Sequence, residues 1–196
     1  MINRVLITGH ACSGKTTLRK RLDRDWSIPT APEHTTRPAR SFEQDGLDYI
    51  FVNDESFDKS VSHFLYTEEY QIDNDTRWRY GLPKQAVNTY GDGLATMIVP
   101  VKRVLDIYNQ IPDGQGFVVV LTADKTELQN RWNKSRNDAD RFDFIYDRDA
   151  RYIDEIQKRI LDKDLYGIQL ESCRNRDVTA AYLVGIITHS RRFSQK

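Results

Sequence analysis

Continuous apolar runs alternate with amphipathic segments along most of the chain. Three of the runs have the length and composition of buried parallel strands, and they occupy residues 4–8, 95–99 and 117–121. Apolar residues at helical spacing predict helices at residues 15–25, 101–111, 125–135, 147–163 and 178–188, with a last strand at 166–170. Strands that alternate with helices favour an α/β fold in which helices flank both faces of a parallel core sheet.

The stretch between the first helix and the second apolar run has a different character. Its pattern predicts strands at residues 28–31, 47–52, 63–72 and 77–81, a helix that starts at Asp54, and a helix at 83–90. We therefore expect a single domain over residues 1–196, interrupted by a small mixed β insert. The expected parts are a core at 1–31, 83–135 and 147–196, an insert at about 32–82, and a short Arg-rich lid at about 136–146.

The composition narrows the classes of partner. The 196 residues include 29 Lys and Arg against 29 Asp and Glu, so the net charge is zero and a generally basic surface for nucleic acid is excluded. No apolar run approaches the roughly 20 residues of a membrane-spanning helix, and the N-terminus lacks a secretory signal. Cys12, Cys173 and four scattered histidines offer neither a disulfide framework nor structural zinc. We expect a cytoplasmic monomer or homodimer with no membrane partner.

Residues 9–16 read Gly-His-Ala-Cys-Ser-Gly-Lys-Thr and match the pattern G-x-x-x-x-G-K-[ST] between a strand and a helix. The glycines let successive backbone N–H groups point at a phosphate, and the following helix adds its positive N-terminal end. Lys15 is expected to reach the β- and γ-phosphates of ATP, and the Thr16 hydroxyl to ligate Mg²⁺. The residues expected to bind ATP are Gly9, Cys12, Ser13, Gly14, Lys15, Thr16 and Thr17.

A second cationic segment follows in the predicted insert. Arg37 and Arg40 lie three residues apart on a loop stiffened by proline, so both guanidinium groups can converge on one phosphate. Glu43 can hold one guanidinium in place, and Tyr49 can add an uncharged hydroxyl donor. The alternative interpretation of this segment is a solvated charged loop.

With both segments in place, the chain resembles the guanylate kinase family. The family pattern joins a phosphate loop to Ser-x-Ser-x-Thr-Thr-Arg-x-x-Arg-x-x-Glu-x-x-Gly-x-Asp-Tyr-x-Phe-Val and to a later Tyr-Gly pair. The residues in register are Thr35, Thr36, Arg37, Arg40, Glu43, Gly46, Asp48, Tyr49, Phe51 and Val52, then Tyr80 and Gly81. The lid region is similar through Leu128, Arg131, Arg136 and Arg148, so the resemblance spans roughly residues 3–165.

The resemblance implies an ATP-dependent nucleoside monophosphate kinase that uses Mg²⁺. It implies that the acceptor phosphate is held by Arg37, Arg40, Tyr49 and Tyr80. It also implies that Lys15 and the lid arginines Arg131, Arg136 and Arg148 act on the transferring phosphoryl group. Phosphoryl transfer needs positioning and charge neutralisation more than covalent chemistry, which agrees with this set of cations.

The chain departs from the family pattern mainly where the pattern reads guanine. Glu33 replaces a serine, Tyr66 replaces a glutamate with Glu68 slightly displaced, and Leu82 replaces a serine or threonine. We expect these four side chains to line the base site. We therefore expect that GMP is not the best acceptor, because a site built to pair with one base rejects other bases. The expected acceptor is a pyrimidine or modified deoxynucleoside monophosphate.

A further departure concerns the metal. An acidic pair that ends the next core strand in the family falls on Val99-Pro100-Val101 here. One possibility is that Thr16, phosphates and water hold Mg²⁺ without a carboxylate, since Mg²⁺ usually keeps several water ligands. The other is that a carboxylate elsewhere in the chain ligates the ion.

Three other interpretations stay open. The ribose bisphosphate phosphokinases also resemble guanylate kinases and lack the acidic pair, and Lys102 and Arg103 could meet a sugar phosphate. A kinase acting on a modified base is neither supported nor excluded. A non-catalytic module that binds phosphopeptides with the acceptor clamp is disfavoured, because Gly14, Lys15 and Thr16 are all present.

Overall fold

The computed structural model describes residues 2–87, 93–135, 141–172 and 176–193. The chain divides into two compact units, one formed by Met1–Pro29 with Leu94–Lys196 and the other by Thr30–Gly93. The second unit contains the predicted insert and extends beyond it at both ends, so residues 83–93, which the sequence pattern assigned to the core, lie in this unit.

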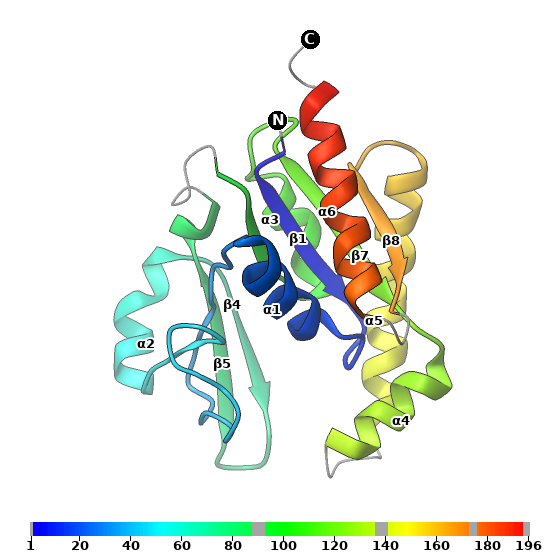
Figure 1. Cartoon of the computed structure of the whole chain (residues 1–196). Helices are drawn as coiled ribbons and strands as arrows, with labels where there is room; N and C mark the ends of the chain where they lie inside the picture. Colours follow the sequence, from blue (N-terminus) through cyan, green and yellow to red (C-terminus); the bar gives the residue numbers. More distant parts are fainter. Residues whose placement is uncertain (1, 88–92, 136–140, 173–175, 194–196) are drawn as a thin grey trace. The chain divides into compact units, whose positions relative to one another are not determined.

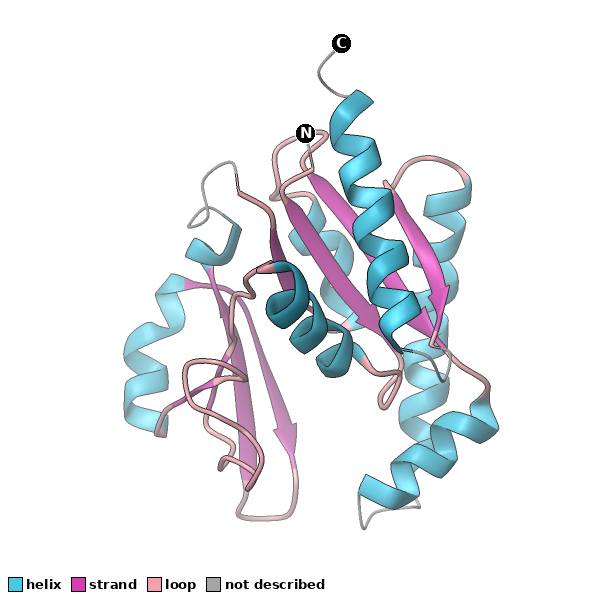
Figure 2. Cartoon of the chain, viewed as in Figure 1, coloured by secondary structure: helices cyan, strands magenta, loops and turns pink. Residues whose placement is uncertain are grey.

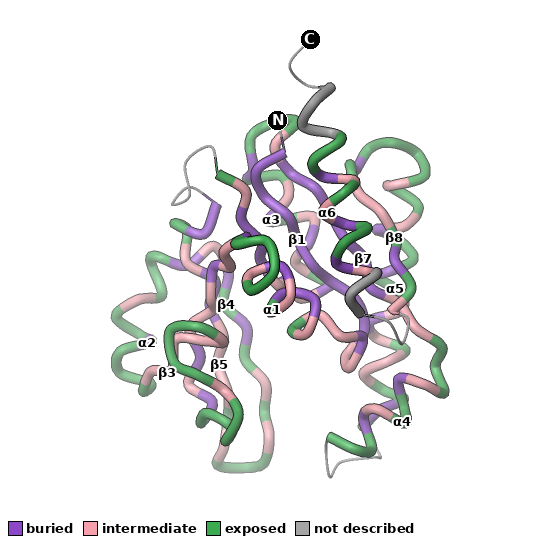
Figure 3. The backbone as a smooth tube through the Cα atoms, viewed as in Figure 1, coloured by how far each residue is buried: buried purple, intermediate pink, exposed green. Residues whose placement is uncertain are grey.

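The first unit is built on a parallel sheet of four strands in the order β6-β1-β7-β8 (Figure 1). The strands are β1 (Arg4–Gly9), β6 (Ala95–Ile98), β7 (Gly116–Thr122) and β8 (Gly167–Glu171). β1 lies between β6 and β7 and is buried over its whole length (Figure 3), as a continuous apolar run requires. The predicted parallel sheet and its four strands are confirmed.

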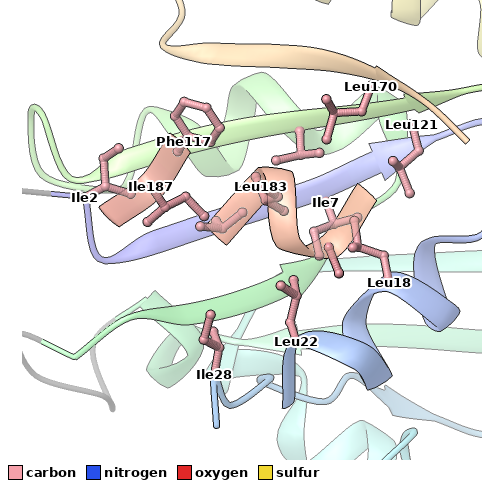
Figure 4. Packing of buried hydrophobic residues seen from close by; sticks show 13 residues of the cluster. Ile2, Ile7, Leu18, Leu22, Ile28, Phe117, Leu121, Leu170, Leu183 and Ile187 are labelled. Atoms are coloured by element: carbon pink, nitrogen blue, oxygen red, sulfur yellow. The ribbon is translucent and has the colours of Figure 1, made fainter. Parts of the chain in front are cut away.

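Helices cover both faces of this sheet (Figure 2). They are α1 (Lys15–Trp26), η3 (Val101–Arg103), α3 (Val104–Tyr108), α5 (Phe142–Leu161) and α6 (Arg176–Phe193), where η marks a 3₁₀ helix. α4 (Lys125–Ser135) packs against α5. On one face, Leu18 and Leu22 of α1 and Leu183 and Ile187 of α6 pack with Ile7 of β1 (Figure 4). α3 and α5 lie on the other face, which confirms the predicted α/β arrangement.

The second unit is built on a mixed sheet in the order β3-β2-β5-β4. Its elements are β2 (His34–Thr35), β3 (Ile50–Phe51), α2 (Asp54–Ser60), η1 (Val61–His63), β4 (Phe64–Gln71), β5 (Arg77–Pro83) and η2 (Lys84–Val87). β4 and β5 form the predicted antiparallel hairpin, while β2 pairs with β3 in parallel. The Asn53 side chain caps α2 by accepting a hydrogen bond from the Ser56 amide, so this helix begins where the sequence indicates.

Four predicted elements need correction. Residues 28–31 form no strand and contain a single bridge residue, Thr30, because Pro29 and Pro32 lack the N–H groups that a ladder needs. The strand expected at 47–52 is reduced to Ile50–Phe51. The helix expected at 83–90 is a 3₁₀ helix over Lys84–Val87 in its described part, and α5 begins at Phe142 inside the predicted lid.

Gly81 of the Tyr-Gly pair has a packing role in this unit. It lies opposite His34 in the β2–β5 register, and a Cβ atom at Gly81 would lie 2.5 Å from Cδ2 of Phe64. The Phe64 ring also packs against Phe57 of α2 at a centroid distance of 5.0 Å. The absence of a side chain at Gly81 therefore lets Phe64 join α2 to the sheet.

We predict that Gly81→Ala destabilises the protein by about 1–3 kcal/mol, because the added methyl group must displace a packed ring. The measurement is urea unfolding followed by circular dichroism. Gly185→Ala is the matched control, since Gly185 faces open space and a helical Gly→Ala change leaves stability unchanged or raises it by up to about 1 kcal/mol. Equal unfolding midpoints for Gly81→Ala and the wild type would contradict this packing role.

Candidate functional site

The phosphate loop, residues 9–16, has a backbone that only this pattern of glycines permits. Gly9 has φ +135°, and a Cβ atom there would lie 2.1 Å from the carbonyl oxygen of Leu121. Gly14 has φ +96° and immediately precedes α1, and Cys12 also adopts a left-handed conformation at φ +62°. The loop therefore curls between β1 and α1, as the motif predicts.

Lys15 bridges the two ends of this loop. Its Nζ atom donates hydrogen bonds to the carbonyl oxygens of Gly9 at 2.9 Å and His10 at 2.7 Å. The first turn of α1 holds no acidic residue that would offset the positive end of the helix. The loop thus places an ammonium group and a helix N-terminus together, which suits a polyphosphate.

The hydroxyl groups of Ser13, Thr16 and Thr17, which were expected to lie at the ATP site, differ in exposure. Ser13 is buried, and its Oγ atom has no hydrogen-bond partner within the described part of the chain. Thr16, in the first turn of α1, is exposed and Thr17 is partly exposed. A buried hydroxyl without a partner and an exposed hydroxyl beside Lys15 are both compatible with a ligand that brings its own oxygen atoms and Mg²⁺.

Arg131 lies beside the phosphate loop. Its Nη1 atom is 3.3 Å from the carbonyl oxygen of Cys12 and 3.1 Å from Oγ of Ser172, and its Nε atom donates to Glu127 at 2.9 Å. These contacts fix one predicted catalytic arginine next to the expected ATP site.

The other predicted lid arginines are less closely placed. Arg148 is partly exposed on α5 and donates to the buried carboxylate of Asp149 at 2.7 Å. Arg136 lies outside the described residues. Cys12, which was expected to contact ATP, has its Sγ atom 3.8 Å from Oγ of Ser135 on α4.

An aromatic contact ties the phosphate loop to α5. The rings of His10 and Tyr146 stack at 4.3 Å with an interplanar angle of 5°. Lys125 of α4 places its Nζ atom 4.9 Å from the centre of the Tyr146 ring. Burial lowers the pKa of His10, although Asp149 opposes the shift, so the stacked imidazole is neutral at neutral pH. Sequence reasoning missed this pair, because position 10 is a variable position of the motif.

In the second unit, the predicted acceptor residues lie along one face of the mixed sheet. Tyr66 is opposite Leu82 and Glu68 is opposite Tyr80 in the β4–β5 register. Thr35 of β2 is opposite Tyr80 on the other side, so alternation places Glu33 on this same face. We call this surface the acceptor face, and its members are Glu33, Thr35, Arg37, Tyr49, Tyr66, Glu68, Tyr70, Tyr80 and Leu82.

Arg37 is the cationic centre of the acceptor face. Its Nη2 atom donates to both carboxylate oxygens of Glu43, at 2.8 and 2.9 Å, and both side chains are almost fully buried, at 4% and 7% exposure. Its guanidinium carbon lies 5.3 Å from the centre of the Tyr49 ring. The Thr35 hydroxyl accepts from the Arg37 amide at 3.1 Å, which fixes the backbone as well. The expectation that Glu43 holds a guanidinium is confirmed.

Arg40 is more exposed than Arg37. Glu43 accepts a hydrogen bond from the Arg40 amide at 2.9 Å, and the Arg40 guanidinium lies 3.7 Å from the same carboxylate. Tyr49 and Tyr80 meet edge to face at 6.0 Å, and burial raises the pKa of both phenols. These phenols are therefore uncharged donors at neutral pH.

The acceptor face also has an acidic group of residues, which we call its acidic end: Glu33, Tyr66, Glu68 and Tyr70. The Tyr66 hydroxyl donates to Glu33, and the Tyr70 hydroxyl donates to Glu68. Loss of hydration raises the pKa of Glu33 to about 7; the bond from Tyr66 opposes the shift and the nearby Glu68 adds to it. Sequence reasoning missed Tyr70, although its position four residues after Tyr66 on one strand could have revealed it.

The described residues offer few protein ligands for a metal. Among them, no group of three or more His, Cys, Asp or Glu side chains is arranged to hold a metal ion. Val99 and Val101, which follow β6 where the family pattern has acids, are buried. In the same part of the chain, no helix is long and apolar enough to cross a membrane.

Comparisons with known proteins agree with this geometry. A family model described as guanylate kinase matches residues 2–97. A guanylate kinase of Latilactobacillus sakei is 31% identical over 139 residues, which cover 68% of this chain and 66% of that relative. A guanylate kinase of Caldanaerobacter subterraneus is 24% identical over 169 residues, which cover 82% of this chain and 80% of that relative.

The fold has a counterpart among solved structures. The crystal structure of guanylate kinase from Anaplasma phagocytophilum has a TM-score of 0.60 at 17% sequence identity, over 96% of this chain and 86% of that chain. The residues matched by the family model include the phosphate loop, Arg37 and Tyr80. The chain therefore belongs to the guanylate kinase family.

Proposed function

We propose that this protein transfers the γ-phosphoryl group of ATP to a nucleoside or deoxynucleoside monophosphate whose base is not guanine, giving the diphosphate. The observation that carries the proposal is the buried Arg37–Glu43 pair on the acceptor face, in a chain that also has an intact phosphate loop. A guanidinium held in place before the substrate arrives is suited to the phosphate of a nucleotide.

The proposed acceptor site uses four donors. Arg37 and Arg40 neutralise the acceptor phosphate, and the neutral phenols of Tyr49 and Tyr80 donate to its oxygens. Glu43 accepts from Nη2 of Arg37 and the Pro38 carbonyl oxygen accepts from Nη1 at 2.7 Å, so together they keep Arg37 in one orientation. Such positioning supplies most of what phosphoryl transfer needs.

The proposed ATP site is the phosphate loop. Lys15 exchanges its bonds to the Gly9 and His10 carbonyl oxygens for bonds to the β- and γ-phosphates. Mg²⁺, when bound, neutralises phosphate charge, and the exposed Thr16 hydroxyl would hold it together with phosphate oxygens and water. Arg131, Arg136 and Arg148 are the proposed lid cations, which neutralise the transferring group.

The proposed change of base rests on the acidic end of the acceptor face. Glu33, Tyr66 and Leu82 are all larger than the side chains expected at a guanine site of the family pattern, and Glu33 is bonded to Tyr66. A guanine that relied on hydroxyl side chains at positions 33 and 82 and on a carboxylate at position 66 loses both space and hydrogen bonds.

We predict that Lys15→Ala lowers ATP affinity by at least about 100-fold and abolishes phosphoryl transfer, since it removes the cation aimed at the developing charge. Fluorescent ATP titration and coupled ADP detection measure the two effects. Lys20→Ala, an exposed change on the same helix, is expected to behave like the wild type. A different result would indicate a non-catalytic binding module: the wild type transfers no phosphate, and Lys15→Ala does not change the affinity for ATP.

We predict that Arg37→Ala raises the KM for the nucleotide acceptor at least about 10-fold, because a charged hydrogen-bond donor is lost. Glu43→Gln, which leaves Arg37 in place without its charged partner, is expected to give a smaller rise. The KM for ATP stays unchanged in both variants. Arg77→Ala, at an exposed ion pair on β5, is the control, and the same acceptor KM in Arg37→Ala and Arg77→Ala would refute the clamp.

We predict that GMP and dGMP are used at least about 10-fold less efficiently than the best acceptor, since the guanine-reading groups are replaced. The measurement is kcat/KM for a panel of nucleoside and deoxynucleoside monophosphates with coupled ADP detection. A clear preference for GMP or dGMP would show that the substituted residues do not set the base.

A further inference from the structure

The acidic end of the acceptor face is rich in hydrogen-bond acceptors and poor in donors. A phenol carries one hydroxyl proton, and those of Tyr66 and Tyr70 are directed to Glu33 and Glu68. The remaining hydrogen-bonding positions of both phenols and of both ionised carboxylates can accept but not donate. A ligand that pairs with this end of the face must therefore bring N–H or O–H groups of its own.

The same end is crowded. Tyr66 and Leu82 lie directly opposite each other on β4 and β5, and both are buried. The Glu33 carboxylate reaches over from the residue before β2 to bond the Tyr66 hydroxyl. Three large side chains in contact leave less room than small side chains would, which favours a base with one ring over a base with two.

We propose that the acceptor carries a one-ring base with an exocyclic amine, of the cytosine type, and that Glu33 reads this amine. The inference rests on the proposed kinase function and deepens it. An exocyclic amine offers two N–H donors to an acceptor-rich surface, whereas the carbonyl group that uracil and thymine carry at the same position would face acceptors and stay unpaired.

The groups around Glu33 make its hydrogen bonding with the base depend on pH. Tyr66 and Glu68 face it from β4, Tyr80 from β5 and Tyr49 from the residue before β3. The raised pKa of Glu33, about 7, means that the carboxyl group is mostly protonated at pH 6 and mostly ionised at pH 8. An ionised Glu33 accepts only, while a protonated one can also donate to a carbonyl oxygen. Discrimination against uracil and thymine therefore rises from pH 6 to pH 8.

The test compares kcat/KM for CMP, dCMP, UMP, dTMP, AMP and GMP at pH 6 and pH 8. We expect CMP or dCMP to be the best acceptor of the wild type, at least about 10-fold better than the matching carbonyl pyrimidine at pH 8. In Glu33→Gln the amide can donate as well as accept, so the ratio of CMP to UMP falls toward one and no longer changes with pH. Glu69→Gln, at an exposed ion pair on the other face of β4, keeps the wild-type ratio.

Two results would overturn this inference while leaving the kinase function intact. One is a wild-type preference for UMP, dTMP or a purine monophosphate, and the other is an amine-to-carbonyl ratio that Glu33→Gln does not change. If the folded protein phosphorylates no acceptor, the proposed kinase function fails instead. Thermal shifts then test recognition of the base without catalysis. A rise in Tm that is larger with CMP than with UMP, and that loses this difference in Glu33→Gln, supports recognition of the base by Glu33. Equal rises with CMP and UMP refute it.

Discussion

The acceptor face depends on one buried ion pair. The loop from Thr36 to Tyr49 contains little regular secondary structure, and two hydrogen bonds join Arg37 to Glu43 within it. Glu43 also accepts from the Arg40 amide, so a single carboxylate orders both predicted phosphate-binding arginines. Burial of two charges adds little net stability, because desolvation offsets their attraction. The pair is better understood as positioning, which holds a guanidinium ready for a phosphate.

The face that this pair organises is polarised. Arg37, with Arg40 beside it, supplies the positive charge of this face, and Glu33 and Glu68 supply its acidic groups. A nucleotide has the matching asymmetry, with an anionic phosphate at one end and a base that can donate hydrogen bonds at the other. The zero net charge of the chain conceals this local separation, which explains why composition excludes a generally basic surface but says nothing about the site.

The sequence predicts the parts of the structure that local pattern controls. The core strands, the β4–β5 hairpin and the curled phosphate loop follow from apolar runs, turn residues and motif glycines. The start of α5 at Phe142 was missed, because the ring of Phe142 packs 5.8 Å from Trp132 of α4, a contact that helical periodicity does not report. The His10–Tyr146 stack was missed because position 10 is variable in the phosphate-loop motif. The pairing of Tyr66 with Glu33 was also beyond reach, since it joins side chains 33 residues apart.

These long-range contacts have a consequence for the lid. α4 and α5 are the helices that flank residues 136–140, and each contacts the phosphate loop: Arg131 of α4 through the Cys12 carbonyl oxygen, and Tyr146 of α5 through His10. Lys125 also joins the two helices through an ion pair with Asp143 at 2.8 Å. The phosphate loop is therefore in direct contact with both helices. The proposed lid arginines Arg131 and Arg148 therefore lie on helices that pack against the phosphate loop.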